Sequence, residues 1–408
     1  MENLTMNAIR EKEFKDMVNE VNLRIQNNEE LPPANIIVAG ITGAGKSTLL
    51  NAVFGKELAP TGIGNPVTDA SKKYEDENVP IRIWDTVGFE LSEEKRRAVI
   101  NDIRDIICQK NKEKDTFDRI HAIWYCVNAE SKRFQEIEAN FVIELHRLQV
   151  PFIIVMTQCF SKKSNIKFEN EIKEILSKKG VTDIPIIQVL AQEKEIEFGD
   201  ATQIITAKGL KELVDLTINN IPDYLKNGFI AAQKIDKDIK RIASIGIISE
   251  YVKLAKEGFW DKIPLANIAT ANNKVKNMFK DITRIYNSKF SDKELERLVD
   301  VIRCSLLKWN GKILTLLNPS NRKLHKDLSN LINVMNIETN LIEEKFKSSE
   351  KSALFIAFAG MTSLNAIEEE WDNSTEKELR DIDKLAQNLK KKLDDIIMYA
   401  DDPKHMYV

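Results

Sequence analysis

The first 31 residues predict a charged amphipathic helix that ends at the pair Pro32-Pro33, because proline cannot continue a helix. The apolar face of this helix consists of Ile9, Phe14, Met17, Val21 and Ile25. A single amphipathic helix must bury its apolar face against another part of the protein. We therefore expect residues 1–33 to pack on the C-terminal region.

From residue 34 to residue 225, short apolar runs alternate with longer amphipathic segments. The runs predict strands at 36–39, 70–74, 81–84, 120–127, 150–156 and 184–190, the last of these being the final strand. The amphipathic segments predict helices after residue 46 and at 134–148, 168–178 and 209–221. This alternation is typical of an α/β domain with a doubly wound, mostly parallel sheet. In such a sheet, a ligand binds at the carboxyl ends of the strands.

The pattern from residue 226 to residue 408 is helical only, and it predicts a C-terminal all-helical domain. Two capping boxes, Ser291–Glu294 and Thr375–Glu378, each precede a run of apolar residues at helical spacing. Further helices are expected at 324–346 and over the apolar segment 353–366. The chain is therefore predicted to comprise an N-terminal helix (1–33), an α/β domain (34–225) and a helical domain (226–408).

The turn after the first predicted strand has the frame G-x-x-x-x-G-K-S, that of a phosphate-binding loop. Glycines allow the backbone to wrap around a phosphate, and the amides at a helix N-terminus favour an anion. A lysine can neutralise the outer phosphates, and a serine hydroxyl can bind Mg²⁺. The predicted contacts are Gly40, Thr42, Gly43, Ala44, Gly45, Lys46, Ser47 and Thr48. The chain is thus expected to bind a nucleoside phosphate.

A second motif, Asp85-Thr86-Val87-Gly88, follows the strand at 81–84. Asp85 can hold Mg²⁺ through a water, and the N–H of Gly88 can contact a γ-phosphate. A threonine in the preceding loop is expected to close over the metal and the γ-phosphate. Thr68 is the favoured candidate, and Thr61 is the alternative.

Composition narrows the class of partner and the compartment. The 60 basic and 63 acidic residues give a net charge of −3, so no nucleic-acid or anionic-membrane partner is indicated. Four dispersed cysteines without a C-x-x-C motif fit reduced thiols in the cytoplasm. The charged N-terminus does not resemble a signal peptide. Segment 353–366 is interpreted as a buried helix, with peripheral membrane contact as the alternative. His325 and His405 are isolated and predict no metal site.

These motifs resemble those of translation-factor-related P-loop GTPases. Gly40–Thr48, Thr68 and Asp85–Gly88 correspond to the phosphate loop, the switch-I threonine and the switch-II motif. The stretches Ile123–Asn128 and Val155–Cys159 are similar to ribosome-binding-type or dynamin-like G domains of bacteria and fungi. The overall layout resembles immunity-related GTPases. The resemblance implies a Mg²⁺-dependent GTPase that binds GTP and GDP.

Two departures from this resemblance concern catalysis and base selection. The position after the switch-II glycine, often a glutamine that orients water, is Phe89. The guanine-reading motif N/T-K-x-D is replaced by Thr157-Gln158-Cys159-Phe160, which lacks the aspartate. Thr157 and Gln158 are still expected beside the base, and the amide of Ala191 is expected to contact the guanine carbonyl. A preference for guanine over adenine is therefore expected from the resemblance and not from this motif.

The missing catalytic group is expected to be an arginine supplied across a nucleotide-controlled dimer. Arg133 is the favoured candidate because it follows the strand at 120–127, and Arg96-Arg97 is the alternative. Together with Lys46, Thr68 and Gly88, Arg133 forms the predicted catalytic set. The predicted function is a slow GTPase switch that forms a homodimer or a larger assembly. The alternatives are a nucleotide-dependent structural protein with little turnover, and a P-loop ATPase or kinase.

Overall fold

The computed structural model describes the chain in segments separated by gaps. These segments are 31–55, 65–68, 71–76, 79–86, 93–112, 116–198, 201–256, 268–288, 290–308 and 348–401. The chain divides into two compact units, Met1–Lys237 and Asp238–Val408. The predicted N-terminal helix and the predicted helix at 324–346 lie outside the described residues, and the predicted domain boundaries stay predictions.

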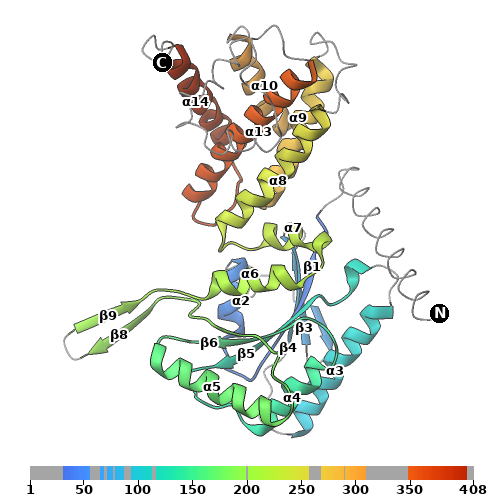
Figure 1. Cartoon of the computed structure of the whole chain (residues 1–408), viewed down its shortest axis with the longest axis vertical. Coiled ribbons are helices and arrows are strands. Elements are labelled where there is room, and N and C mark those ends of the chain that lie inside the picture. Colours follow the sequence, from blue (N-terminus) through green and yellow to red (C-terminus); the bar gives the residue numbers. More distant parts are fainter. Residues whose placement is uncertain are drawn as a thin grey trace. The chain divides into compact units, whose positions relative to one another are not determined.

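The first unit is built on a sheet of seven described strands in the order β2-β3-β4-β1-β5-β6-β7 (Figure 1). Strands β1, β4, β5, β6 and β7 run parallel, while β2 and β3 add an antiparallel edge. The bounds are β1 Ala34–Ala39, β2 Asn65–Thr68, β3 Ser71–Asp76, β4 Val79–Thr86, β5 Ala122–Asn128, β6 Phe152–Thr157 and β7 Ile186–Gln188. The predicted α/β, mostly parallel fold class is confirmed.

Helices cover both faces of this sheet, as Figure 1 shows. Their bounds are α2 Lys46–Phe54, α3 Glu93–Lys112, α4 Glu136–His146, α5 Lys162–Lys178, α6 Leu210–Asn220 and α7 Asp223–Ala232, with a short 3-10 turn at Thr116–Asp118. Helices α3, α4 and α5 bury apolar residues against Ile37, Tyr125 and Ile154 on one face of the sheet. Parallel strands are buried on both faces in this architecture, which explains the continuous apolar runs of β1, β5 and β6.

Trp124 organises the opposite face of the sheet, where α2, α6 and α7 lie. Its ring stacks on Phe54 of α2 at 5.9 Å and meets the edge of Phe229 of α7 at 6.5 Å. Its indole N–H donates to Thr217 Oγ1 of α6 at 3.1 Å, so the buried polar atom is satisfied. One side chain of the interior strand β5 thus contacts three helices.

The segment that follows α7 is tied to the end of α2. The N–H of Lys234 donates to Val53 O at 2.8 Å. Gln233 is fully buried, and its Oε1 accepts bonds of 2.7 Å from the amides of Ile235 and Asp236. The connection from residue 233 to residue 236 is therefore an ordered, hydrogen-bonded turn.

A two-stranded antiparallel hairpin, β8 (Lys194–Phe198) and β9 (Ala201–Ile205), follows β7 and extends from the sheet (Figure 1). The prediction that 184–190 is the last strand is therefore wrong. Charged and apolar residues alternate over Glu195–Phe198, and the Gly199-Asp200 pair between the strands is a turn signal, so the sequence carries both signs of a hairpin.

The second unit is helical in its described part, as predicted. Its helices are α8 Lys237–Lys256, α9 Ile268–Ile285, α10 Asp292–Lys308, α13 Ser348–Asn373 and α14 Ile382–Asp401. The apolar segment 353–366 lies within α13, where Ala353, Ile356 and Ala359 are fully buried. No described helix combines the length and the apolar character needed to cross a membrane.

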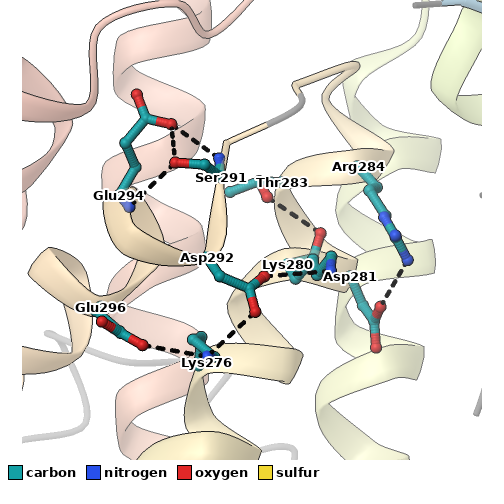
Figure 2. Close-up of polar contacts among 9 residues, drawn as sticks. All are labelled: Lys276, Lys280, Asp281, Thr283, Arg284, Ser291, Asp292, Glu294 and Glu296. Atoms are coloured by element: carbon teal, nitrogen blue, oxygen red, sulfur yellow. Dashed lines mark hydrogen bonds and ion pairs between the residues drawn. The ribbon is translucent and has the colours of Figure 1, made fainter. Parts of the chain in front are cut away.

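Ion pairs join α9 to α10 (Figure 2). Lys276 pairs with Asp292 and with Glu296, and Lys280 pairs with Asp292, each at 3.3 Å. At the start of α10, the N–H of Ser291 donates to Glu294 Oε2 at 2.8 Å, and the N–H of Glu294 donates to Ser291 Oγ at 3.4 Å. The predicted capping box Ser291–Glu294 is confirmed.

The second predicted capping box, Thr375–Glu378, is wrong, because α14 begins only at Ile382. The cap is Asp381, whose Oδ1 accepts bonds of 3.0 Å from the amides of Asp383 and Lys384. Its carbonyl also accepts the first helical bond, from the N–H of Leu385 at 3.1 Å. Lys377 has a left-handed backbone (φ 54°), which prevents a helix from running through the predicted box.

We expect Asp381→Ala to destabilise the helical unit by about 1 kcal/mol, because two amides of the first turn lose their acceptor. Thr375→Ala is the matched control, since Thr375 is an exposed residue outside the helix. Unfolding in urea, monitored by circular dichroism, measures the free energy of unfolding of both variants. Equal losses of stability, or a larger loss for Thr375→Ala, would contradict the assignment of Asp381 as the cap.

Candidate functional site

The phosphate loop lies between the end of β1 and the start of α2, as the motif predicts. A cavity of about 400 Å³ opens at this point. Its lining residues are Thr42, Gly43, Ala44, Gly45, Lys46, Ser47, Thr48, Tyr74, Asp85 and Thr86. The structure thus brings together seven predicted residues of the loop and the predicted metal-holding Asp85.

Two glycines allow the loop to lie directly on the ends of the sheet strands. Gly40 has φ 149°, and a Cβ atom there would lie 2.5 Å from the carbonyl oxygen of Cys126 in β5. Gly45 has φ 79°, and a Cβ atom there would lie 3.4 Å from Thr157 of β6. Glycine is required at the first position by space and at both by backbone conformation.

Side chains from β5 and β6 hold the loop in its curved form. The hydroxyl of Thr157 is buried and donates to Ala44 O at 2.7 Å. Asn128 Nδ2 donates to Gly43 O at 3.2 Å. Because both residues end parallel strands, their side chains reach the same edge of the sheet. Thr157, which the sequence places near the base, therefore also supports the phosphate loop.

Lys46 lies across the mouth of the loop. Its Nζ donates to Gly40 O at 3.0 Å and to Ile41 O at 3.4 Å. Ser47 is exposed at the start of α2. The amides and the positive end of the helix dipole at this terminus favour an anion in the cavity.

Tyr74 and Thr86 are cavity residues that the sequence analysis missed. Burial, and secondly the negative charge of Asp85, raise the pKa of the Tyr74 phenol above its ordinary value, so the phenol keeps its proton. Thr86 donates to Val38 O at 3.3 Å. Tyr74 lies in the polar edge strand β3, which carries no motif that would have indicated it. Thr86, by contrast, belongs to the Asp85–Gly88 motif and could have been considered.

The remaining predicted site residues either do not line the cavity or lie outside the residues that the structure describes. Thr68 ends the edge strand β2, where its backbone pairs with Ser71. Arg133 is exposed in the loop after β5. Gln158 has a left-handed backbone (φ 57°) in the turn after β6, and Ala191 is half-buried after β7. Gly88, like Phe89 and Thr61, lies outside the described residues, so its predicted role stays a prediction.

Residues 35–158 match the family model described as 50S ribosome-binding GTPase. The chain thus carries a P-loop, GTP-binding domain of this GTPase family, and the resemblance stated above is confirmed. Interferon-gamma-inducible GTPase 10 of Mus musculus is 29% identical over 166 residues, which are 39% of this chain and 36% of that protein. The chain therefore covers little more than a third of the length of that relative.

Two solved structures are also similar to this chain. A probable GTP-binding protein engB is 23% identical, with a TM-score of 0.31, and the match covers 46% of this chain and 97% of that one. Toc33 from Arabidopsis thaliana, in complex with Mg²⁺ and GMPPNP, is 15% identical, with a TM-score of 0.34, and the match covers 50% of this chain and 92% of that one.

The packing behind the loop predicts the reactivity of the four cysteines. Burial raises the pKa of Cys126 to about 12 and that of Cys159 to about 11, whereas Cys108 and Cys304 are exposed. At about pH 8, a raised pKa means fewer reactive thiolates. We expect a thiol reagent to modify two cysteines of the native chain quickly, and all four in urea. Fast modification of a third cysteine in the native protein would contradict the burial behind the loop.

Proposed function

We propose that this chain is a Mg²⁺-dependent GTPase switch with slow intrinsic hydrolysis, which acts through nucleotide-controlled association of two copies. The observation that carries the proposal is the cavity in which the phosphate loop faces Asp85. Lys46 and Ser47 on one element and Asp85 on another meet in one space. This pairing suits a phosphate chain with a bound divalent cation.

The loop residues bind the phosphates. Lys46 Nζ already lies at the loop mouth on two carbonyl oxygens, and a phosphate oxygen offers it a stronger, charge-assisted partner. The amides at the start of α2 supply further donors. Thr157 and Asn128 keep the loop in shape through Ala44 and Gly43, so that the donors are fixed before the ligand arrives.

The cavity also fits Mg²⁺. The hydroxyl of Ser47 and the carboxylate of Asp85 are hard oxygen donors, and Mg²⁺ typically takes one or two protein ligands together with substrate phosphates. When bound, the metal neutralises charge on the β- and γ-phosphates. Ser47 would bind it directly, and Asp85 would hold one of its waters.

Slow hydrolysis follows from the side chain after the switch-II glycine. Phe89 has no donor or acceptor with which to orient an attacking water. A second copy could supply the missing charge. Arg133 is exposed in the loop after β5, and the hydrogen bond from Asn128 to Gly43 fixes the start of that loop beside the phosphate site. A cytoplasmic location and peripheral membrane contact stay predictions.

We expect Lys46→Ala to reduce the affinity for GTP by at least about 100-fold, because the charge facing the outer phosphates is lost. Titration with a ribose-labelled fluorescent GTP analogue measures the affinity. Circular dichroism should remain native, since Lys46 is no part of the core. Normal binding by a folded variant would overturn the phosphate-site assignment.

The association of two copies predicts that GTP turnover per chain rises with protein concentration. In Arg133→Ala the turnover should stay flat while nucleotide binding remains, since an arginine at the γ-phosphate accelerates hydrolysis by about 10³–10⁵-fold. Arg147→Ala, which changes another exposed arginine, is the control and should behave like the wild type. A wild-type rate independent of concentration would exclude the dimer mechanism. Binding without turnover would favour the structural, assembly-type alternative.

A further inference from the structure

The hairpin of β8 and β9 is anchored at its base and projects beyond the sheet (Figure 1). Leu190 and Lys208, which flank the hairpin in sequence, exchange two backbone hydrogen bonds of 2.9 Å. At the start of β8, Lys194 Nζ pairs with Glu130 Oε2 at 3.3 Å and lies 4.2 Å from the centroid of the Phe160 ring. The base is thus fixed to the loop after β5 and to the turn after β6, and the two strands form an ordered arm.

Each strand of this arm has one edge that faces away from the other strand. Among the described strands, β8 and β9 pair with each other and with no third strand. The loop between Phe198 and Ala201 has two residues, so this pair exchanges backbone bonds and the pairs alternate from there. By this alternation, the N–H and C=O groups of Thr202 and Ile204 point away from β8. This outward side of β9, which we call the β9 edge, offers backbone donors and acceptors to another strand.

The two edges of the arm differ in their protection against pairing. Three of the five residues of β8 are charged, and charged side chains keep an edge strand from pairing with another chain. These residues are Lys194, Glu195 and Glu197. Residues 201–207, by contrast, include no charged residue, no proline and no glycine. Because Thr202, Ile204 and Thr206 are also exposed, the β9 edge is the one open to a partner strand.

The sequence of the β9 edge reads nearly the same in both directions. Residues 201–207 are A-T-Q-I-I-T-A, a palindrome about Ile204 except that Gln203 corresponds to Ile205. Antiparallel pairing about a two-fold axis at Ile204 places Thr202 opposite Thr206 of the second copy and Ile204 opposite its own counterpart. A two-fold contact requires such self-complementarity, and pairs of threonines or of β-branched residues stabilise antiparallel sheets. The symmetry of the edge therefore favours a second copy of this chain as its partner.

Pairing through the β9 edge also ends the assembly at two copies. The joined sheet has four strands in the order β8-β9-β9-β8, and its outer edges are the two charged β8 strands. Those edges are protected against further pairing, so a third copy is not added. A four-stranded sheet is also more stable than a two-stranded hairpin, which is marginal in isolation. Pairing thus stabilises the arm as well as joining the copies.

We propose that the β9 edge is a homodimer contact, in which two copies pair antiparallel about Ile204 and form one four-stranded sheet. None of the residues that line the phosphate cavity belongs to this edge. The contact therefore needs no nucleotide, and it is separate from the nucleotide-controlled association proposed above. It goes beyond the proposed function by assigning a contact between copies to a defined strand.

The first test is sedimentation velocity over a series of protein concentrations, with EDTA and without nucleotide. We expect the wild type to pass from monomer to dimer as the concentration rises. Ile204→Lys brings two ammonium groups opposite each other across the axis and should raise the dimer dissociation constant by at least about tenfold. The matched control is Ile242→Lys in α8, because Ile242 is 68% exposed and Ile204 is 58% exposed. This control should dimerise like the wild type.

A wild type that stays monomeric throughout the series would overturn the inference and would leave the β9 edge to a strand of another protein. A dimer that a folded Ile204→Lys variant leaves intact would also overturn it, as would wild-type assemblies of more than two copies. Titration with a fluorescent GTP analogue is a separate measurement, and the wild type and both variants should bind equally. If none of the three proteins binds the analogue, the proposed function is overturned while the dimer contact stands.

The second test examines the register, and it also decides the matter if Ile204→Lys does not fold. In a chain whose exposed Cys108 and Cys304 are replaced by serine, Ile204→Cys should form a disulfide between copies on air oxidation. Directly opposed residues that exchange backbone bonds have Cα atoms about 5.5 Å apart, which a disulfide spans. Gln203→Cys is the control, since its two copies are diagonal neighbours about 7–8 Å apart and beyond that reach. Equal cross-linking of both variants, or none of Ile204→Cys, would overturn the inference.

Discussion

The close approach of the phosphate loop to the carboxyl ends of the central strands is the constraint on which the rest of the first unit depends. The backbone at Gly40 comes so near the carbonyl oxygen of Cys126 that no side chain fits between them. The hydroxyl of Thr157 then bonds the loop carbonyl of Ala44 from the next strand. Because the loop touches β5 and β6 directly, each residue that ends those strands becomes a neighbour of the phosphate loop.

This contact also explains why the core and the site cannot be separated. Strand β5 supplies Trp124 to three helices on one face, and it supplies Cys126 and Asn128 to the loop at its end. A shift of the strand within the sheet would move both sets of contacts. Close-packed interiors resist such shifts, so the donors around the phosphates keep a fixed arrangement.

The sequence predicted the features whose causes are local. The phosphate loop and its flanking elements follow from glycine spacing and apolar runs, and the Ser291–Glu294 box follows from side chains three residues apart. The Asp381 cap was missed because the Thr375–Glu378 pattern competes with it, and the hairpin was missed because each of its strands has only five residues. Tyr74 could not be found at all, since only the pairing of β3 with β4 brings it to the cavity that Asp85 lines.

The bond between Lys234 and the last turn of α2 gives the phosphate-binding helix a second role, as the attachment point of the segment that follows α7. The helix has nine residues and is about 13 Å long, with the phosphate loop at one end and Val53 at the other. The chain that leaves toward the helical unit is attached at Val53, and Gln233 keeps that attachment ordered. One short helix therefore joins the phosphate loop to the segment through which the chain leaves the first unit, and no strand of the sheet lies between them in this connection.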